Sequence, residues 1–211
     1  MPLRWMPPVL ALAGGIAVWA MLPGAGDLRR FDPKAVARGE TEMWRSYYDH
    51  RGGALFLELG GLLRQQYSMS WAQSQLAAYR AARAAVVFQK GHNRAEYERV
   101  LPYLEGFYAS IRHSNTPFDV KEAARLELEW WIVHRERARH GAGDLAAALA
   151  RLQACLYAMP PERFQEHART RAEAMLMRDD RASNGGVSDA DWARIHALLD
   201  RSWISLWQTV N

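Results

Sequence analysis

The sequence predicts an all-α protein, an irregular antiparallel helical bundle of about seven or eight helices preceded by one N-terminal transmembrane helix. Apolar residues recur at helical spacing in one segment after another, and no two segments alternate in the way that would let them pair as strands. Short connections between the segments favour antiparallel neighbours. With 211 residues, the chain is long enough for one core and an appendage. We therefore expect a transmembrane anchor over residues 1–26 and one helical domain over residues 27–211.

The N-terminal segment predicts membrane attachment. Residues 5–22 form an uncharged run of about 18 residues, just long enough to cross a bilayer as a helix. The alternative is a signal-like segment with a small-residue cleavage site at residues 24–26, but the apolar run is longer than a usual signal core. The small residues Ala11, Gly14 and Gly15 would let another membrane helix approach closely, although such residues are also simply common in membrane helices.

The charges that flank this segment leave its orientation open. More cations follow it than precede it, so the positive-inside rule places the helical domain in the cytoplasm of a bacterial-type cell. A signal-like layout would instead export the domain to the periplasm. In either case we expect a single-pass protein of the inner (plasma) membrane. The cations concerned are Arg4 before the segment and Arg29, Arg30, Lys34 and Arg38 after it.

Capping residues mark where most of the helices begin. An Asp, Ser or Asn whose side chain can accept a backbone hydrogen bond stands before each of five helices. Pro102 predicts a kink or a restart. The segment ALFLELGGLLRQQY is apolar on most sides and predicts a buried helix over residues 54–67. The expected helices span residues 33–50, 54–67, 71–90, 93–112, 118–140, 145–157, 162–181 and 189 onward; their capping residues are Asp32, Ser70, Asn93, Asp119 and Ser188.

The helix over residues 118–140 is expected at the centre of the bundle. Its apolar residues fall within about 40° of one line, and Glu127 and His134 lie on the same line. An inward carboxylate and imidazole need partners, because an unpaired buried charge is strongly destabilising. We interpret them as a polar network with Arg80 or Arg171 and tyrosine hydroxyls that fixes the helix register. The residues of the apolar line are Val120, Ala124, Trp131 and Ala138.

A metal site is the sharper alternative for the same inward residues. Glu40, Glu58, Glu127 and His134 all fall on apolar faces. A di-iron bundle, however, uses Glu-x-x-His on two of its helices, and Trp130 stands three residues after Glu127. Haem ligation by a lone histidine has no C-x-x-C-H motif to support it. We therefore expect no cofactor, and we keep as the alternative a membrane-bound helical metal- or haem-dependent enzyme that uses inward-facing Glu and His.

Other classes of function lack their sequence signals. The net charge is only +4, and no run of cations indicates nucleic-acid binding. The single cysteine, Cys155, cannot form an internal disulfide. No phosphate-binding loop or nucleophile motif occurs.

The aromatic content favours an interaction protein. Nine tryptophans supply large contact areas, and Trp, Tyr, Met and Arg dominate the energy of protein contacts. We expect partner contacts at Trp192, Trp203 and Trp207, and at residues 175–177. The sequence thus predicts a non-enzymatic accessory or scaffolding subunit of a larger membrane complex, with an energy-converting complex as the first kind to test. Its expected partners are the lipid bilayer and other membrane-protein subunits.

Overall fold

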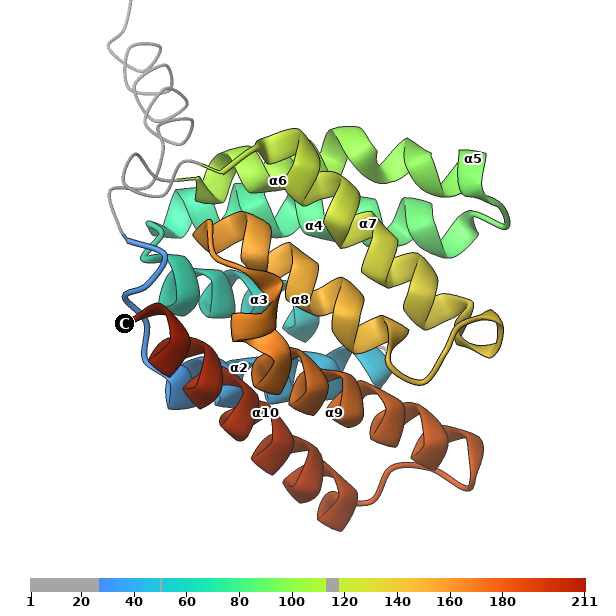
Figure 1. Cartoon of the computed structure of the whole chain (residues 1–211). Coiled ribbons are helices and arrows are strands. Elements are labelled where there is room, and N and C mark those ends of the chain that lie inside the picture. Colours follow the sequence, from blue (N-terminus) through green and yellow to red (C-terminus); the bar gives the residue numbers. More distant parts are fainter. Residues whose placement is uncertain (1–26, 50, 113–117) are drawn as a thin grey trace, which may run out of the picture.

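The computed structural model describes residues 27–49, 51–112 and 118–211, and over these residues the fold is all helical, without strands (Figure 1). This confirms the predicted fold class for the described part of the chain. Eight helices of eleven or more residues make up that part. They are α2 (Pro33–Tyr48), α3 (Gly52–Tyr67), α4 (Trp71–Lys90), α6 (Leu101–Ile111), α7 (Val120–Arg135), α8 (Asp144–Tyr157), α9 (Gln165–Ser183) and α10 (Asp189–Val210).

The predicted caps are confirmed. Asp32 accepts hydrogen bonds from the backbone amides of Lys34 and Ala35 at the start of α2. Ser70 and Ser188 each form a reciprocal capping box with the third residue of the helix that follows. These contacts join residues two or three positions apart, so they form as soon as the first turn does.

Several predicted helices end or restart as short turns. The four-residue α5 (Arg94–Tyr97) and the 3-10 turn η1 (Glu98–Val100) precede α6, in which Pro102 is the second residue. The restart predicted at Pro102 is therefore confirmed. The central helix α7 ends at Arg135 and continues only as the 3-10 turn η2 (Arg137–Arg139), short of the expected His140. A 3-10 turn, η3 (Pro161–Phe164), opens the segment that becomes α9.

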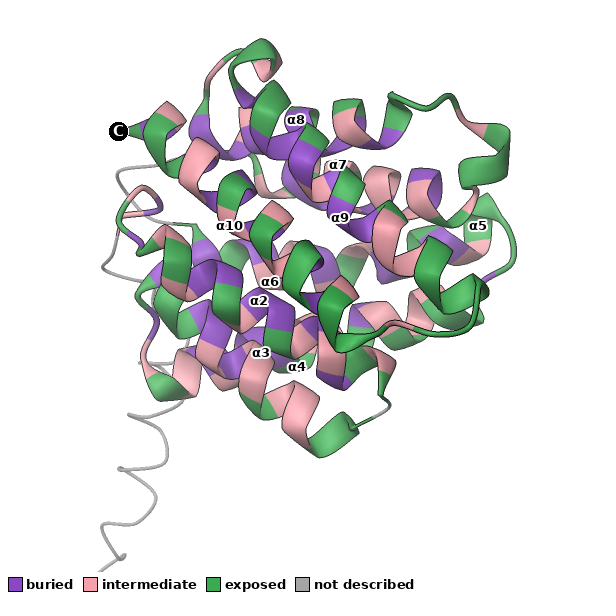
Figure 2. Ribbon diagram, turned by 90° about the horizontal axis from the view of Figure 1, so that it is seen from below, coloured by how far each residue is buried: buried purple, intermediate pink, exposed green. Residues whose placement is uncertain are grey.

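The long helices form a ring. Each packs against the one before it in the sequence, and α10 packs against α2 to close the circle. The α3 and α4 helices lie on the opposite side of the molecule from α8 (Figure 2). At the usual spacing of about 9 Å between helix axes, the centre of an eight-helix ring is about 12 Å from each axis. Large side chains are therefore needed to fill it.

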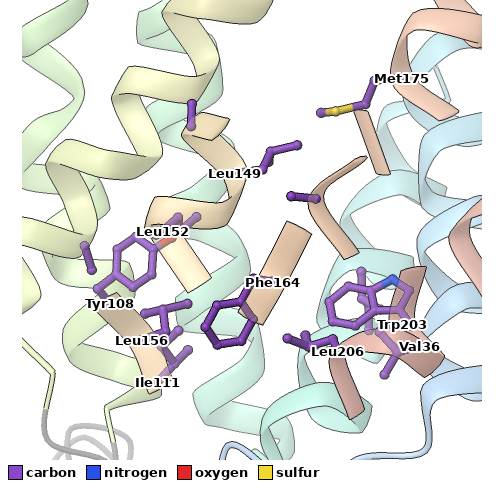
Figure 3. Packing of buried hydrophobic residues seen from close by; sticks show 14 of the residues in the cluster. Val36, Tyr108, Ile111, Leu149, Leu152, Leu156, Phe164, Met175, Trp203 and Leu206 are labelled. Carbon is purple, nitrogen blue, oxygen red and sulfur yellow. The ribbon is translucent and has the colours of Figure 1, made fainter. Parts of the chain in front are cut away.

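Aromatic side chains fill the centre of the ring. Phe164 is fully buried and lies between a group on α6 and α8 that includes Tyr108 and a group on α2 and α10 that includes Trp203 (Figure 3). Tyr157 stacks on Phe164 with ring centroids 6.0 Å apart. Three of the tryptophans, Trp44, Trp192 and Trp203, are buried in this core.

The α3 helix corrects one prediction. It is helical over the expected residues, but it is not a buried helix. Its buried residues, Gly60, Leu62, Leu63 and Tyr67, all lie in its second half, and the side chain of Leu57 is 67% exposed. The ring covers only the inner side of α3, so apolar residues on its other sides remain in contact with solvent.

No helix in the described part of the chain is long and apolar enough to cross a membrane. The predicted anchor over residues 1–26, with Ala11, Gly14 and Gly15, lies outside the described residues.

Candidate functional site

A buried ion pair joins three helices of the ring. The carboxylate of Glu40 on α2 is 1% exposed. Its Oε1 accepts a hydrogen bond from Nη2 of Arg171 on α9 at 2.5 Å, and its Oε2 accepts one from Nε1 of Trp203 on α10 at 2.6 Å. Arg171 also lies over the indole of Trp203. One carboxylate therefore ties together the helices that close the ring.

Glu127 on α7 forms a second set of hydrogen bonds. Its Oε2 accepts a bond from the hydroxyl of Tyr108 at 2.7 Å, and its Oε1 accepts one from Nε1 of Trp131 at 2.9 Å. The predicted tie to tyrosine hydroxyls is thus confirmed for Glu127. Arg80, which was also considered as its partner, instead donates to the carbonyl of Gly106 and to the hydroxyl of Ser110 on α6.

Arg171 lies in the field of both carboxylates. Burial alone would lower the pKa of Arg171, but the charges of Glu40 and Glu127 outweigh burial and raise it. The pKa values of Tyr67 and Tyr108 are raised mainly by burial and then by the charge of Glu127. Arg171 therefore stays charged, and Tyr67 and Tyr108 stay neutral, across the physiological pH range. Constant protonation states of these three side chains suit a fixed network.

His134 belongs to a different cluster, near the far end of α7. Its Nε2 lies 3.0 Å from Oδ2 of Asp179 on α9, although without the alignment of a good hydrogen bond. Asp179 also pairs with Arg178 at 2.6 Å and with Arg137 at 3.3 Å. Burial raises the pKa of Asp179, but the nearby His134 and Arg178 outweigh that effect and lower it. The predicted arginine partner for His134 is therefore replaced by an aspartate that arginines surround.

His167 on α9 is a fully buried polar residue. Its Nδ1 lies 2.8 Å from the hydroxyl oxygen of Ser202 and 3.0 Å from the carbonyl oxygen of the same residue. Because a carbonyl oxygen can only accept, we assign the proton to Nδ1. The Ser202 hydroxyl donates back to the carbonyl of His167. Nε2 is buried and has no hydrogen-bond partner in the described structure. Burial, with the charge of Arg171, lowers the pKa of His167 to about 3, so the ring is neutral.

The structure separates the four metal candidates. Glu40, Glu127 and His134 have the distinct partners given above, and Oε2 of Glu58 is buried without a hydrogen-bond partner among the described residues. In that part of the chain, no three His, Cys, Asp or Glu side chains are grouped closely enough to hold a metal ion. Glu40 and Glu127 both act on Arg171, whereas His134 lies against Asp179 in another cluster, so the four candidates do not form one metal site.

The predicted partner contacts differ in exposure. Trp192 and Trp203 are 7% and 3% exposed and serve the core, whereas Trp207 is 41% exposed on the outside of α10. Met177 lines a groove of about 500 Å³ between the start of α8 and α9, together with Ala146, Ala172 and Leu176. Trp207 and this groove are the predicted contact regions that offer surface to a partner.

Comparisons of the chain with known protein families, with curated proteins and with solved structures found no match.

Proposed function

We propose that this chain is a non-enzymatic accessory or scaffolding subunit of a larger membrane complex, anchored by a single N-terminal helix over residues 5–22. The observation that carries the proposal is that the inward carboxylates are hydrogen-bonded to side chains of the bundle itself. Both carboxylate oxygens of Glu40, and both of Glu127, accept hydrogen bonds from fixed donors. These donors lie on other helices or, for Trp131, on the next turn of α7. Such ties support a role in holding the helices in register.

The bilayer and partner-subunit parts of the proposal rest on sequence and on exposed surface. The uncharged run of residues 5–22 supports insertion, and Ala11, Gly14 and Gly15 support close approach of another membrane helix. On the helical domain, Trp207 and the groove beside Met177 offer aromatic and apolar contact area.

Gentle solubilisation of membranes tests the proposal. The full chain is expected to migrate in a larger assembly and to bring defined proteins with it through two purification steps. Gly14→Leu/Gly15→Leu and Trp207→Glu should each shift the chain toward smaller species. The double variant Ile16→Leu/Val18→Leu changes two large apolar residues of the same run, leaves its small residues in place and serves as the control.

Two results would contradict the proposal. A chain that always migrates alone is not a subunit, and a mature chain recovered from the soluble fraction without its leader is not anchored.

A further inference from the structure

The exposed large apolar side chains of the described residues are unevenly distributed. Seven such side chains are exposed, and four of them lie on two adjacent helices, α3 and α4; the other three, Tyr47, Leu176 and Trp207, lie on three different helices. Single exposed apolar residues need no explanation, but a group on neighbouring helices does. The four are Leu57 (67% exposed), Trp71 (66%), Tyr79 (53%) and Val86 (44%).

Leu57, Tyr79 and Val86 belong to one outer face, and Trp71, the first residue of α4, borders it about 80° from Tyr79 around the helix. The two helices approach closely at Gly60, where a Cβ would come within 2.4 Å of the Gln75 side chain. The α3 and α4 helices run in opposite directions (Figure 1). Counted from the contact of Gly60 with Gln75, Leu57 on α3 is therefore level with the turn of α4 that carries Tyr79. Tyr79 and Val86 are seven positions apart, which places them within about 20° of each other on α4.

The charges on this face are all positive. Arg64 is seven positions after Leu57 on α3, and Arg83 and Lys90 lie within about 40° of Tyr79 on α4. Arg83 lies beside the ring of Tyr103 on α6, with its guanidinium carbon 5.6 Å from the ring centroid. All three cations are exposed. The α4 helix has no acidic residue, and the single acid of α3, Glu58, has one carboxylate oxygen buried.

We infer that this face, which we name the α3–α4 outer face (Leu57, Arg64, Trp71, Tyr79, Arg83, Val86 and Lys90), rests on the surface of a bilayer that contains anionic lipids. Aromatic and aliphatic side chains flanked by Arg and Lys are the composition of helices that lie in the membrane interface. The long cationic side chains can reach phosphate groups while their stems cover apolar surface.

The contact is interfacial rather than spanning. Both helices would lie along the membrane plane, on the side of the molecule opposite α8 (Figure 2). The inference goes beyond the proposed function, because it needs neither the N-terminal anchor nor a partner subunit.

Tryptophan quenching by brominated lipids tests this inference on the full chain. Vesicles of phosphatidylcholine and phosphatidylglycerol are prepared with bromines on the acyl chains, and matched vesicles contain phosphatidylcholine alone. Trp71→Phe is expected to remove a distinct part of the quenched emission in the anionic vesicles, whereas Trp207→Phe, the control for exposed tryptophan, should remove little. The tryptophans of the N-terminal segment are present in both variants, so they contribute equally to the quenched emission of each.

Charge reversal supplies a second readout. Arg64→Glu/Lys90→Glu should reduce the quenching of Trp71 at least twofold, as should 0.5 M NaCl. Arg151→Glu/Arg194→Glu changes the net charge by the same amount on α8 and α10 and should leave the quenching unchanged. All the substituted side chains are exposed, and circular dichroism checks that each variant is folded.

Several outcomes would overturn the inference. One is equal quenching of Trp71 and Trp207, and another is quenching of Trp71 that does not depend on lipid charge. Shielding of Trp71 that requires a co-purified protein would assign the face to a protein partner instead of to lipid. The first two outcomes do not depend on whether the chain migrates in a larger assembly, so they are distinct from the test of the proposed function.

Discussion

The two sides of the ring use similar residues in opposite ways. Where α2, α9 and α10 meet, Trp203 is buried and its indole nitrogen bonds to Glu40. On the α3–α4 outer face, Trp71 is two-thirds exposed, and the cations nearby have no acid on their own helices with which to pair, apart from Glu58. The first side is closed by neighbouring helices, whereas the second is covered only on its inner surface. A tryptophan therefore forms a structural tie in one place and stays exposed in the other.

The largest expected effect comes from breaking the tie on the closed side. Glu40→Ala leaves Arg171 buried without its counter-charge and should lower the free energy of unfolding by about 3–5 kcal/mol. Chemical denaturation in mild detergent measures it. Glu166→Ala is the matched control, because it removes a carboxylate that pairs with Arg169 and Arg201 at the surface, where about 1 kcal/mol or less is expected. Equal losses in the two variants would contradict the interpretation of Glu40.

A smaller effect is expected at Glu127, which is half-buried. Glu127→Ala leaves the Tyr108 hydroxyl and the Trp131 indole N–H without their acceptor and should destabilise the fold by about 2 kcal/mol. The double variant Glu127→Ala/Tyr108→Phe removes one of the orphaned groups, so it should lose less than the sum of the two single changes. Strict additivity in the denaturation midpoints, or wild-type stability of Glu127→Ala, would argue against the network.

The neutral state of His167 predicts a pH dependence. In the unfolded chain its pKa is about 6.5 and in the folded protein about 3, so between these values only the unfolded state binds the proton. The free energy of unfolding should therefore fall as the pH falls below 6.5, by about 1.4 kcal/mol per pH unit from this group. Above pH 6.5 the group contributes nothing to the slope.

His167→Gln is the variant that tests this dependence. Denaturation between pH 4.5 and 6.5 should show a shallower slope in His167→Gln than in the wild type. His92→Gln, at an exposed position, should leave the slope as it is. An unchanged slope in His167→Gln would mean that the imidazole is not held neutral.

The smallest effect is expected on the open side. Leu57→Ala should change the free energy of unfolding by less than about 0.5 kcal/mol, because its side chain already contacts water. Leu63→Ala, on the same helix but 3% exposed, should cost about 2–5 kcal/mol. Similar losses from the two substitutions would show that the outer side of α3 is covered in solution.

Much of the fold could be predicted because its signals are local. Asp32, Ser70 and Ser188 cap helices through contacts two or three residues away, and Pro102 restarts a helix by its own geometry. Glu127 was predicted as an inward acid tied to a tyrosine, because its apolar neighbours recur at helical spacing. The full extent of the central helix was overestimated, since the pattern continues beyond Arg135 while the hydrogen-bonded helix does not.

The candidate site could be predicted only in part. Glu40 was recognised as an inward acid, but its partners stand 131 and 163 positions later in the chain. His134 was expected to meet an arginine directly and lies instead against Asp179, which arginines flank. The adjacent Arg178 and Asp179 were visible in the sequence as a pair of opposite charges, yet no local rule says what they face.

By itself, the sequence determined the helical class, the helix starts and the polar character of the bundle interior, because capping and periodicity act over one or two turns. Only the tertiary structure decided that α10 packs against α2, that Arg171 forms its ion pair with Glu40, and that one apolar side of α3 stays exposed. Which face of a helix is buried depends on how many neighbours surround it, and that number is set by packing across the whole ring.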